Sequence, residues 1–370
     1  MIATDRFAAV FLALAAGAAA LGGCGRAKRP PAHDPEGGSA FAPPKADPPP
    51  FRRVEVFFGT DREEVPGAPP DARYSERTAA LSYGVCHVSI PRWHKRGELE
   101  EPHWYKLERV EDPEKHVVLL DAERRERADF VAELGAAAAQ ENNLLLFIHG
   151  YNVTFKDAAR RTAQIAFDVG YPGVPLLYSW PSAGATEDYF ADEDANRRTQ
   201  PHLAEFLSTV AGIEGVQRLD VIAHSMGNRA LCEALARLGR ERSNLRIRHL
   251  VLAAPDIDAK IFIDDIWPAM RGLCEDVTLY ASSDDQALVA SGKVHKGVRL
   301  GQSGPEMVLL DGLATIDATG IDTSLLGHSY VAEVVRVLDD LDGHLTKSRP
   351  PADRGLFGRV RGALGYWAFR

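Results

Sequence analysis

One short segment limits most strongly what this chain can fold into: residues 219–223 form an apolar run that leads directly into His224-Ser225-Met226-Gly227. Beyond this tetrapeptide, alanines and leucines recur every three or four residues, which is the spacing of one buried helix face. A strand that passes into a helix so quickly must turn sharply, and small residues are needed where the two backbones cross. The pattern therefore predicts a buried strand, a tight turn and a helix, with a serine at the turn.

Ser225 occupies the third position of the pattern Ala-x-Ser-x-Gly, in which Ala223 replaces the usual first glycine. Alanine is still small enough for the backbones to cross, so the departure is mild. In such a turn the serine hydroxyl stands above the carboxyl end of a sheet, where it can act as a nucleophile. The alternative is an ordinary strand–turn–helix unit whose serine only caps the helix.

A second apolar run, residues 144–148, ends in a turn at residues 149–152. In folds with a serine turn of this kind, a turn after an early strand supplies one backbone N–H to the oxyanion hole, and the residue after the nucleophile supplies the other. The predicted donors are therefore the N–H groups of Tyr151 and Met226. Taken alone, His149 and its glycine are equally compatible with a tight turn whose histidine only packs.

Four aspartates downstream of the serine are candidates for the acid of a catalytic triad. Asp256 and Asp258 follow one strand-like run, and Asp284 and Asp285 follow the next. The later strand is the commoner position of this acid in hydrolases of the fold, so Asp285 is our choice, with Asp284 and Asp256 as alternatives. Each of them also has a purely structural explanation, because aspartates after strands often cap turns and helices.

His328 is the candidate general base, since it lies in a loop just before an apolar-periodic helix and can reach over the strand ends to Ser225. His295 also follows the aspartates, but two lysines flank it and predict a surface residue. His224 points away from the serine by strand alternation. The predicted mechanism is activation of Ser225 by His328, formation of an acyl-enzyme, and hydrolysis by water.

These motifs belong to a series that resembles the α/β-hydrolase superfamily, and more closely a bacterial branch known as a domain of unknown function. The resemblance covers about residues 53–340 and implies an α/β-hydrolase fold with a serine-hydrolase site. In the family pattern, Asp285 matches the retained acid. No substrate is implied, because the substrate of the family is itself unsettled. The segments that carry the resemblance are, in order, VFFGTDR, FIHGYN, YSWPS, AHSMGN, APDID, YASSDD and GHSY.

The remaining pattern predicts an α/β fold with a mostly parallel central sheet and helices on both faces. Strand-like runs alternate with helical ones from about residue 123, and the first strands precede any helix, which predicts an antiparallel edge. The predicted hydrolase domain spans residues 51–345. The strand-like runs lie at 53–58, 81–90, 116–120, 144–148, 174–179, 217–223, 247–253 and 276–282.

Residues 1–23 resemble a lipoprotein signal peptide, because an uncharged apolar run ends in small residues before Cys24. The resemblance implies cleavage before Cys24 and lipid attachment to it; a non-lipidated signal and a single membrane helix are the alternatives. Gly25 stands where aspartate would retain a lipoprotein in the inner membrane, so we expect the outer membrane, facing the periplasm. The proline-rich residues 24–50 predict an extended tether.

Residues 346–370 form a basic C-terminal tail with interleaved aromatic side chains. It is compatible with an interfacial helix, but four glycines disfavour a helix, so a loosely docked tail is the preferred interpretation. The acidic segment 182–199 is predicted to be a solvated helix start, with a roof over the active site as the alternative. The net charge of −9 does not indicate a surface that binds nucleic acid. Neither a metal nor a cofactor is expected.

Two classes of function follow. The first is a cell-envelope serine hydrolase that cleaves an ester, thioester or amide in a small-molecule or lipid-like substrate; acyl transfer would use the same residues. The second is a catalytically silent, lipid-anchored scaffold on the same fold. The presence of Ser225, His328 and the Asp284-Asp285 pair favours the enzyme. The oligomeric state is not predicted.

Overall fold

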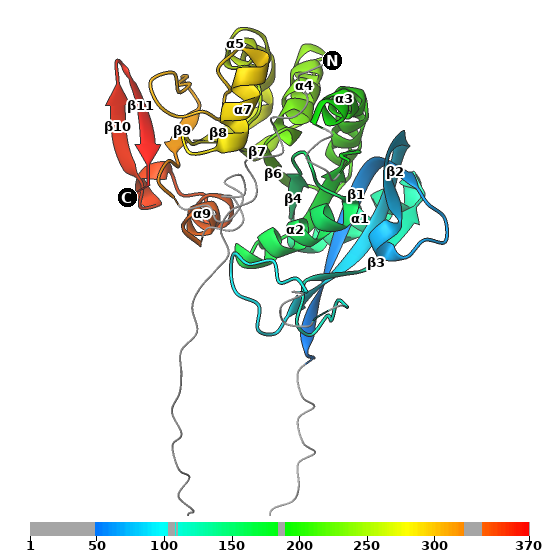
Figure 1. Cartoon of the computed structure of the whole chain (residues 1–370). Helices are drawn as coiled ribbons and strands as arrows, with labels where there is room; N and C mark the ends of the chain where they lie inside the picture. Colours follow the sequence, from blue (N-terminus) through cyan, green and yellow to red (C-terminus); the bar gives the residue numbers. More distant parts are fainter. Residues whose placement is uncertain (1–48, 103–107, 109, 184–188, 322–334, 370) are drawn as a thin grey trace, which may run out of the picture. The chain divides into compact units, whose positions relative to one another are not determined.

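The structure is a computed structural model that describes residues 49–102, 108, 110–183, 189–321 and 335–369 (Figure 1). The predicted signal peptide, Cys24 and nearly all of the tether lie outside the described residues, and so does His328. Among the helices of the described segments, none is both long and apolar enough to cross a membrane. A compact unit begins at Pro49, close to the predicted start of the hydrolase domain.

One sheet of eleven strands organises the described chain, in the order β10-β11-β9-β8-β7-β6-β4-β5-β1-β2-β3. The strands from β9 to β1 pair in parallel. The β1–β2–β3 edge is antiparallel, as predicted. The strands are β1 (Phe51–Glu64), β2 (Tyr74–Pro91), β3 (Val118–Arg125), β4 (Asn143–Ile148), β5 (Val174–Ser179), β6 (Arg218–His224), β7 (Ile247–Ala253), β8 (Cys274–Ala281), β9 (Ala314–Asp317), β10 (Phe357–Arg361) and β11 (Leu364–Ala368).

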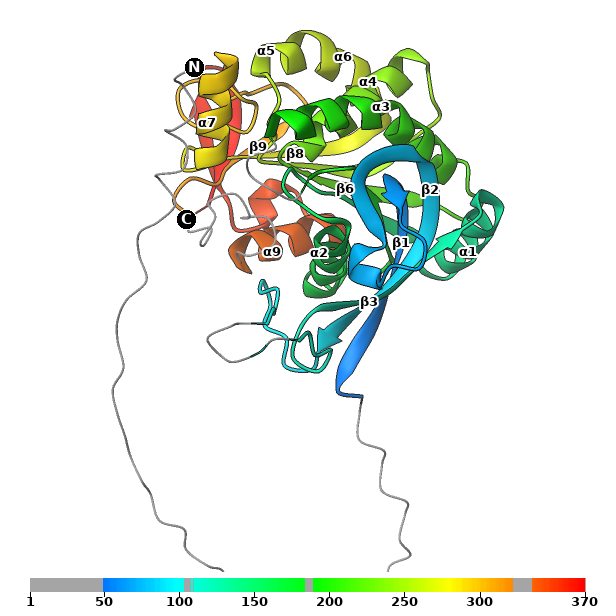
Figure 2. The same ribbon diagram turned by 45° about the vertical axis from the view of Figure 1, so that its right-hand side comes forward.

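Helices cover both faces of this sheet, and Figure 2 shows α3, α4 and α6 on one side and α2 and α9 on the other. The larger helices are α1 (Arg127–Glu141), α2 (Phe155–Asp168), α3 (Tyr189–Ala211), α4 (Gly227–Arg240), α7 (Gln286–His295) and α9 (Val335–Leu341). The short ones are η1 (Pro70–Ala72), α5 (Ala259–Ile261), η4 (Phe262–Ile266), α6 (Trp267–Met270), η5 (Arg271–Leu273), η7 (Asp342–Thr346) and η8 (Pro351–Asp353).

Successive residues of the central strands enter two different hydrophobic clusters, because side chains alternate across a sheet. In β4, Leu144, Leu146 and Ile148 belong to one cluster, and Leu145 and Phe147 belong to the other. Helices α1, α3, α4 and α6 pack into the first cluster, whereas α2 and α9 pack into the second. The α/β fold class with a doubly covered, mostly parallel sheet is therefore confirmed.

The C-terminal residues differ from the loosely docked tail that the sequence predicts. Strands β10 and β11 pair antiparallel around Gly362, whose φ is 63°, and β11 continues the sheet beside β9 (red in Figure 1). Trp367 and Phe369 pack against the second hydrophobic cluster. The glycines that disfavour a helix are thus compatible with a hairpin, since one of them provides the left-handed turn. The hairpin belongs to the same compact unit as the hydrolase domain.

Candidate active site

Ser225 lies at the sharp turn between β6 and α4, with φ at 51° and its side chain buried. A non-glycine residue pays about 1–3 kcal/mol for such a conformation, so neighbouring bonds must hold it. The N–H of Ser225 donates to the carbonyl of Ala253 at 2.9 Å. Its own carbonyl accepts from the backbone and the side-chain amide of Asn228, both at 3.1 Å. The predicted strand–turn–helix unit is therefore present, with the serine in the strained position.

The turn after β4 lies directly against this serine, and two glycines make the approach possible. A Cβ atom on Gly227 would lie 2.2 Å from the carbonyl oxygen of His149. A Cβ atom on Gly150 would lie 3.0 Å from the Cβ of Ser225 and 3.1 Å from Nδ1 of His224. The contact at Gly227 is with a backbone atom and leaves no room for a side chain, whereas the contacts at Gly150 are with side-chain atoms and are only tight, so the two turns are closely packed.

The predicted oxyanion donors, the N–H groups of Tyr151 and Met226, belong to peptide planes that are held by hydrogen bonds. In a trans peptide, the N–H points opposite to the preceding carbonyl. The carbonyl of Ser225, which precedes Met226, is held by Asn228 as described above. The carbonyl of Gly150, which precedes Tyr151, accepts from Nδ1 of His149 at 2.8 Å. Both predicted donors are therefore fixed in direction before any substrate binds.

Asp285 and Asp284 follow β8 and differ sharply in exposure. Asp285 is buried and caps α7, where its Oδ1 accepts from the N–H of Leu288 at 3.0 Å. Asp284 is exposed, and its Oδ2 accepts from the N–H of Gly320 at 2.9 Å. Burial raises the pKa of Tyr151, and the negative charge of Asp285 raises it further. Asp285 therefore lies within electrostatic reach of the turn that borders Ser225.

Comparison with known families decides the identity of the fold. Residues 123–348 match the family described as "Alpha/beta hydrolase of unknown function (DUF900)". The chain belongs to this family. It is also similar to two crystal structures of esterases. One is a tryptophan-to-histidine mutant of the esterase rPPE, with 14% identity, 81% of this chain and 85% of that chain covered, and a TM-score of 0.33.

The second structure is a thermostable esterase from Pseudomonas putida, with 12% identity, 81% and 85% of the two chains covered, and a TM-score of 0.31. No curated protein matches the chain. At such low identities the structural likeness concerns the fold alone. The activity of this α/β hydrolase must therefore be argued from its own residues.

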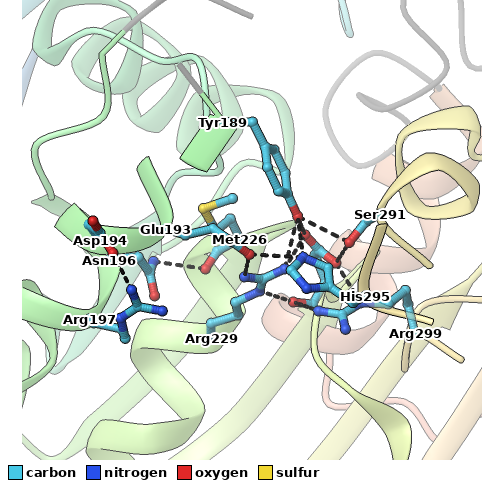
Figure 3. A network of polar contacts seen from close by, with 11 residues as sticks. Tyr189, Glu193, Asp194, Asn196, Arg197, Met226, Arg229, Ser291, His295 and Arg299 are labelled. Carbon is cyan, nitrogen blue, oxygen red and sulfur yellow. Dashed lines mark hydrogen bonds and ion pairs between the residues drawn. The ribbon is translucent and has the colours of Figure 1, made fainter. Parts of the chain in front are cut away.

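Asp256, an alternative acid, is buried in this α/β hydrolase and lies at the centre of an ionic network. Figure 3 shows its partners Tyr189, Arg229, Ser291 and Arg299. Its Oδ1 accepts from Ser291 at 2.6 Å and from Nε of Arg299 at 2.7 Å. Its Oδ2 accepts from Tyr189 and from Nη2 of Arg229, both at 2.7 Å. An ionised carboxylate accepts about four hydrogen bonds, so no acceptor position is left for a catalytic histidine. This geometry favours a structural role.

Asp258 also has a structural role, because its Oδ1 caps α5 by accepting from the N–H groups of Lys260 and Ile261 at 2.9 and 3.0 Å. His295 lies at the exposed end of α7, as predicted, but it is not isolated there. Its Nε2 lies 2.9 Å from a carboxylate oxygen of Glu193, which also pairs with Arg229 in the network of Figure 3.

The acidic segment 182–199 does not form the fully solvated helix start that the sequence predicts, and residues 184–188 lie outside the described part. Asp192, on the first turn of α3, is only 1% exposed. Its carboxylate accepts from the N–H of Asn152 at 3.1 Å and from the hydroxyl of Ser182 at 2.5 Å. The prediction of a solvated helix start is therefore wrong at Asp192, because the backbone N–H of Asn152 in the turn after β4 needs an acceptor and Asp192 provides it.

Sequence reasoning assigned no role to Arg62, which the structure buries beneath the same turn. Its Nη2 donates to the carbonyl of Val153 at 2.7 Å, and its Nε donates to Oγ of Ser179 at 2.9 Å. Oγ of Ser179 lies 3.2 Å from Nε2 of His149, whose Nδ1 binds the turn carbonyl. The pKa of His149 is lowered well below its usual value by burial and by the positive charge of Arg62, so the ring is neutral.

The neutral ring of His149 stacks on the indole of Trp180 at 5.2 Å, and Trp180 donates to the carbonyl of His149 at 2.8 Å. Arg62, Ser179, His149 and Trp180 therefore form one support for the predicted oxyanion turn. The sequence offered no signal for this support, because Arg62 lies among the polar and charged residues 60–64, which are typical of an exposed strand end.

Proposed function

We propose that this protein is a serine hydrolase that cleaves a carboxylic ester, with thioesters and amides as chemically related alternatives. Ser225 is the nucleophile, His328 the general base and Asp285 the acid that orients it. The N–H groups of Tyr151 and Met226 form the oxyanion hole. The proposal rests on one observation above all, the strained turn that holds Ser225 at φ 51° against the turn after β4.

A backbone strain of this kind has a physical rationale in a nucleophile. A serine that merely capped α4 would need no left-handed conformation, because N-caps adopt extended backbone angles. The strained turn instead presents the side chain at the end of the sheet, beside pre-oriented N–H donors. The neutral His149 and the buried Arg62 support these donors from below and act as positioning residues.

The reaction follows from these roles. Oγ of Ser225 attacks the carbonyl carbon of the ester while His328 takes the hydroxyl proton. The two N–H donors stabilise the negative charge on the carbonyl oxygen. The tetrahedral intermediate then collapses, the C–O bond to the alcohol breaks, and His328 returns the proton to the leaving alcohol. Water, activated by His328, hydrolyses the acyl-enzyme and restores Ser225. No cofactor takes part in these steps.

Labelling with a fluorophosphonate probe tests this proposal, because the probe reacts with activated serines only. We expect the mature protein to be labelled, and labelling to disappear in Ser225→Ala and His328→Ala. Ser243→Ala, which removes a serine between α4 and β7, is the matched control and should label like the wild type. A folded wild-type protein that is not labelled at any pH near neutrality would refute the proposal and favour the silent scaffold.

The next measurement determines the class of substrate. Hydrolysis of p-nitrophenyl esters of increasing acyl length, compared with the matching anilides, distinguishes an esterase from an amidase. We expect turnover of the esters, because the alcohol is the better leaving group. Exclusive turnover of the amides would overturn the ester assignment without touching the role of Ser225.

The location is proposed from the sequence of residues 1–24: a lipid at Cys24 anchors the enzyme to the outer membrane, facing the periplasm. Incorporation of radiolabelled palmitate into the full chain, expressed in a Gram-negative host, tests the anchor. Cys24→Ala should abolish incorporation and release the protein from membranes, whereas the control Cys274→Ala should change neither. Incorporation that persists without Cys24 would contradict the proposal.

A further inference from the structure

A second group of polar side chains lies near the amino ends of the parallel strands, whereas Ser225 lies at their carboxyl ends. His249 and Asp276 are register partners near the amino ends of β7 and β8. Strand alternation places both on the sheet face that α9 covers, since their neighbours Leu250 and Val277 enter the other hydrophobic cluster. His344 comes to the same place from η7, a five-residue π-helical turn that follows α9. Turns of this type are frequent at functional sites.

The nitrogen atoms of the two histidines converge on the carboxylate without binding it. Nδ1 of His249 lies 3.6 Å from Oδ2 of Asp276, and Nδ1 of His344 lies 3.7 Å from the same oxygen. These distances are too long for hydrogen bonds. Both Nδ1 atoms are buried and have no hydrogen-bond partner. One donor atom from each residue lies within 4.8 Å of the others.

The other nitrogen of each ring faces a hydroxyl group. Nε2 of His249 lies 3.2 Å from Oγ of Ser348, and Nε2 of His344 lies 3.3 Å from Oγ1 of Thr278. A hydroxyl that accepts from Nε2–H fixes the tautomer and leaves a lone pair on Nδ1. Both lone pairs are then directed toward the space beside Asp276.

The charges around this space are compatible with a cation. Two arginines lie nearby. Arg248 binds Asp220, with Nε 2.8 Å from Oδ1, and Nη1 of Arg354 pairs with Asp340 at 3.0 Å, while Nε and Nη2 of Arg354 are buried without a hydrogen-bond partner. The carboxylate of Asp276 therefore remains as the anionic group of the cluster. The side chain of Asp276 is 42% exposed, which provides a route from solvent.

We propose that His249, Asp276 and His344 bind one divalent transition-metal cation of the Zn²⁺ type, with water completing the coordination. Ligand bonds of about 2.0–2.2 Å in a tetrahedral site place ligand atoms about 3.4 Å apart, close to the two separations measured here. Two imidazoles and one carboxylate favour Zn²⁺, Co²⁺ or Fe²⁺ over Mg²⁺ and Ca²⁺. The cation would join η7 to β7 and β8, so its role is to stabilise the packing of η7 against the amino ends of these two strands.

Titration of the tag-free full-length protein with Co²⁺ tests the proposal directly, because Co²⁺ bound by nitrogen and oxygen ligands absorbs visible light. We expect one equivalent to bind, Zn²⁺ to displace it, and Zn²⁺ to raise the thermal unfolding midpoint. Asp276→Asn and His344→Gln should abolish the absorption. Thr278→Val, which removes a hydroxyl that orients a ligand, should weaken binding about 10- to 100-fold.

His87→Gln is the matched control, since His87 also pairs with a carboxylate, Asp121, at 2.6 Å but lies outside the cluster. This variant should bind Co²⁺ like the wild type. The proposal is overturned if the wild-type protein binds no equivalent of Co²⁺ or Zn²⁺, a measurement that needs no variant to fold. It is also overturned if folded Asp276→Asn binds as tightly as the wild type, because the cation would then lie elsewhere.

Discussion

Gly227→Ala is the substitution that most sharply tests the close packing of the two turns around Ser225. A methyl group at residue 227 would lie 2.2 Å from the carbonyl oxygen of His149 and 3.0 Å from that of Ile148. A carbon and a carbonyl oxygen in contact need about 3.4 Å, so the end of β4 and the start of α4 must separate by roughly 1 Å. Both obstacles are backbone atoms, and no rotamer change can relieve them.

Two quantities follow from this displacement. Overpacking costs about 1–3 kcal/mol of stability. A misplacement of about 1 Å in a group that stabilises the transition state can cost about 100-fold in rate, and the displaced turn carries the predicted donor Tyr151. We therefore expect Gly227→Ala to fold with reduced stability and to react with the fluorophosphonate about 100-fold more slowly. Urea unfolding followed by circular dichroism and the labelling rate constant measure the two effects.

Gly272→Ala is the matched control, because a methyl group there would meet no atom within 4 Å. Its stability should stay within about 0.5 kcal/mol of the wild type, with an unchanged labelling rate. The reasoning is refuted if Gly227→Ala is as stable and as reactive as this control. Loss of stability with an unchanged labelling rate would keep the packing argument and remove Tyr151 from the oxyanion hole.

Three further predictions concern single carboxylates and one histidine. Asp285→Asn should abolish fluorophosphonate labelling with little loss of stability. Asp256→Asn should instead lower the free energy of unfolding by about 3–5 kcal/mol, because it leaves buried guanidinium groups unpaired. The reverse pattern would exchange the roles of the two aspartates. Asp192→Asn should destabilise by about 1.5–3 kcal/mol and slow labelling, since it weakens the bonds that hold the turn after β4, which carries the predicted oxyanion donor Tyr151; denaturant unfolding and labelling rates check this. Burial lowers the pKa of His94, but hydrogen bonds with two carboxylates outweigh it and raise this pKa to about 9. The stabilising contribution of protonated His94 to the free energy of unfolding is therefore complete below about pH 6.5 and is lost as pH rises through 9. His94→Gln should flatten the alkaline limb of a plot of this free energy against pH, and an unchanged limb would contradict the assignment.

The sequence by itself was sufficient for features that are encoded within one or two neighbouring elements. The turn at Ser225 needs only a strand, small residues and a helix in succession, and all of these are visible in one segment. The alternation of apolar runs predicted the strands β1 to β8 and the antiparallel edge, since periodicity is a local property. The order of motifs along the chain was enough to indicate the family.

Tertiary structure decided what depends on contacts between distant segments. The sequence favoured Asp285 over Asp256 only by the common position of the acid along the chain, whereas only the folded chain brings two arginines onto Asp256. The burial of Asp192 and of Arg62 likewise follows from one turn that both residues support.

The same reason explains the C-terminal hairpin and the cluster of His249, Asp276 and His344 near the amino ends of β7 and β8. The hairpin gains its stability by extending the sheet beside β9, a partner that local composition does not reveal. His249, Asp276 and His344 lie far apart in the sequence and match no ligand spacing. Two neighbouring parallel strands and a π-helical turn bring them together, so their convergence is a property of the fold alone.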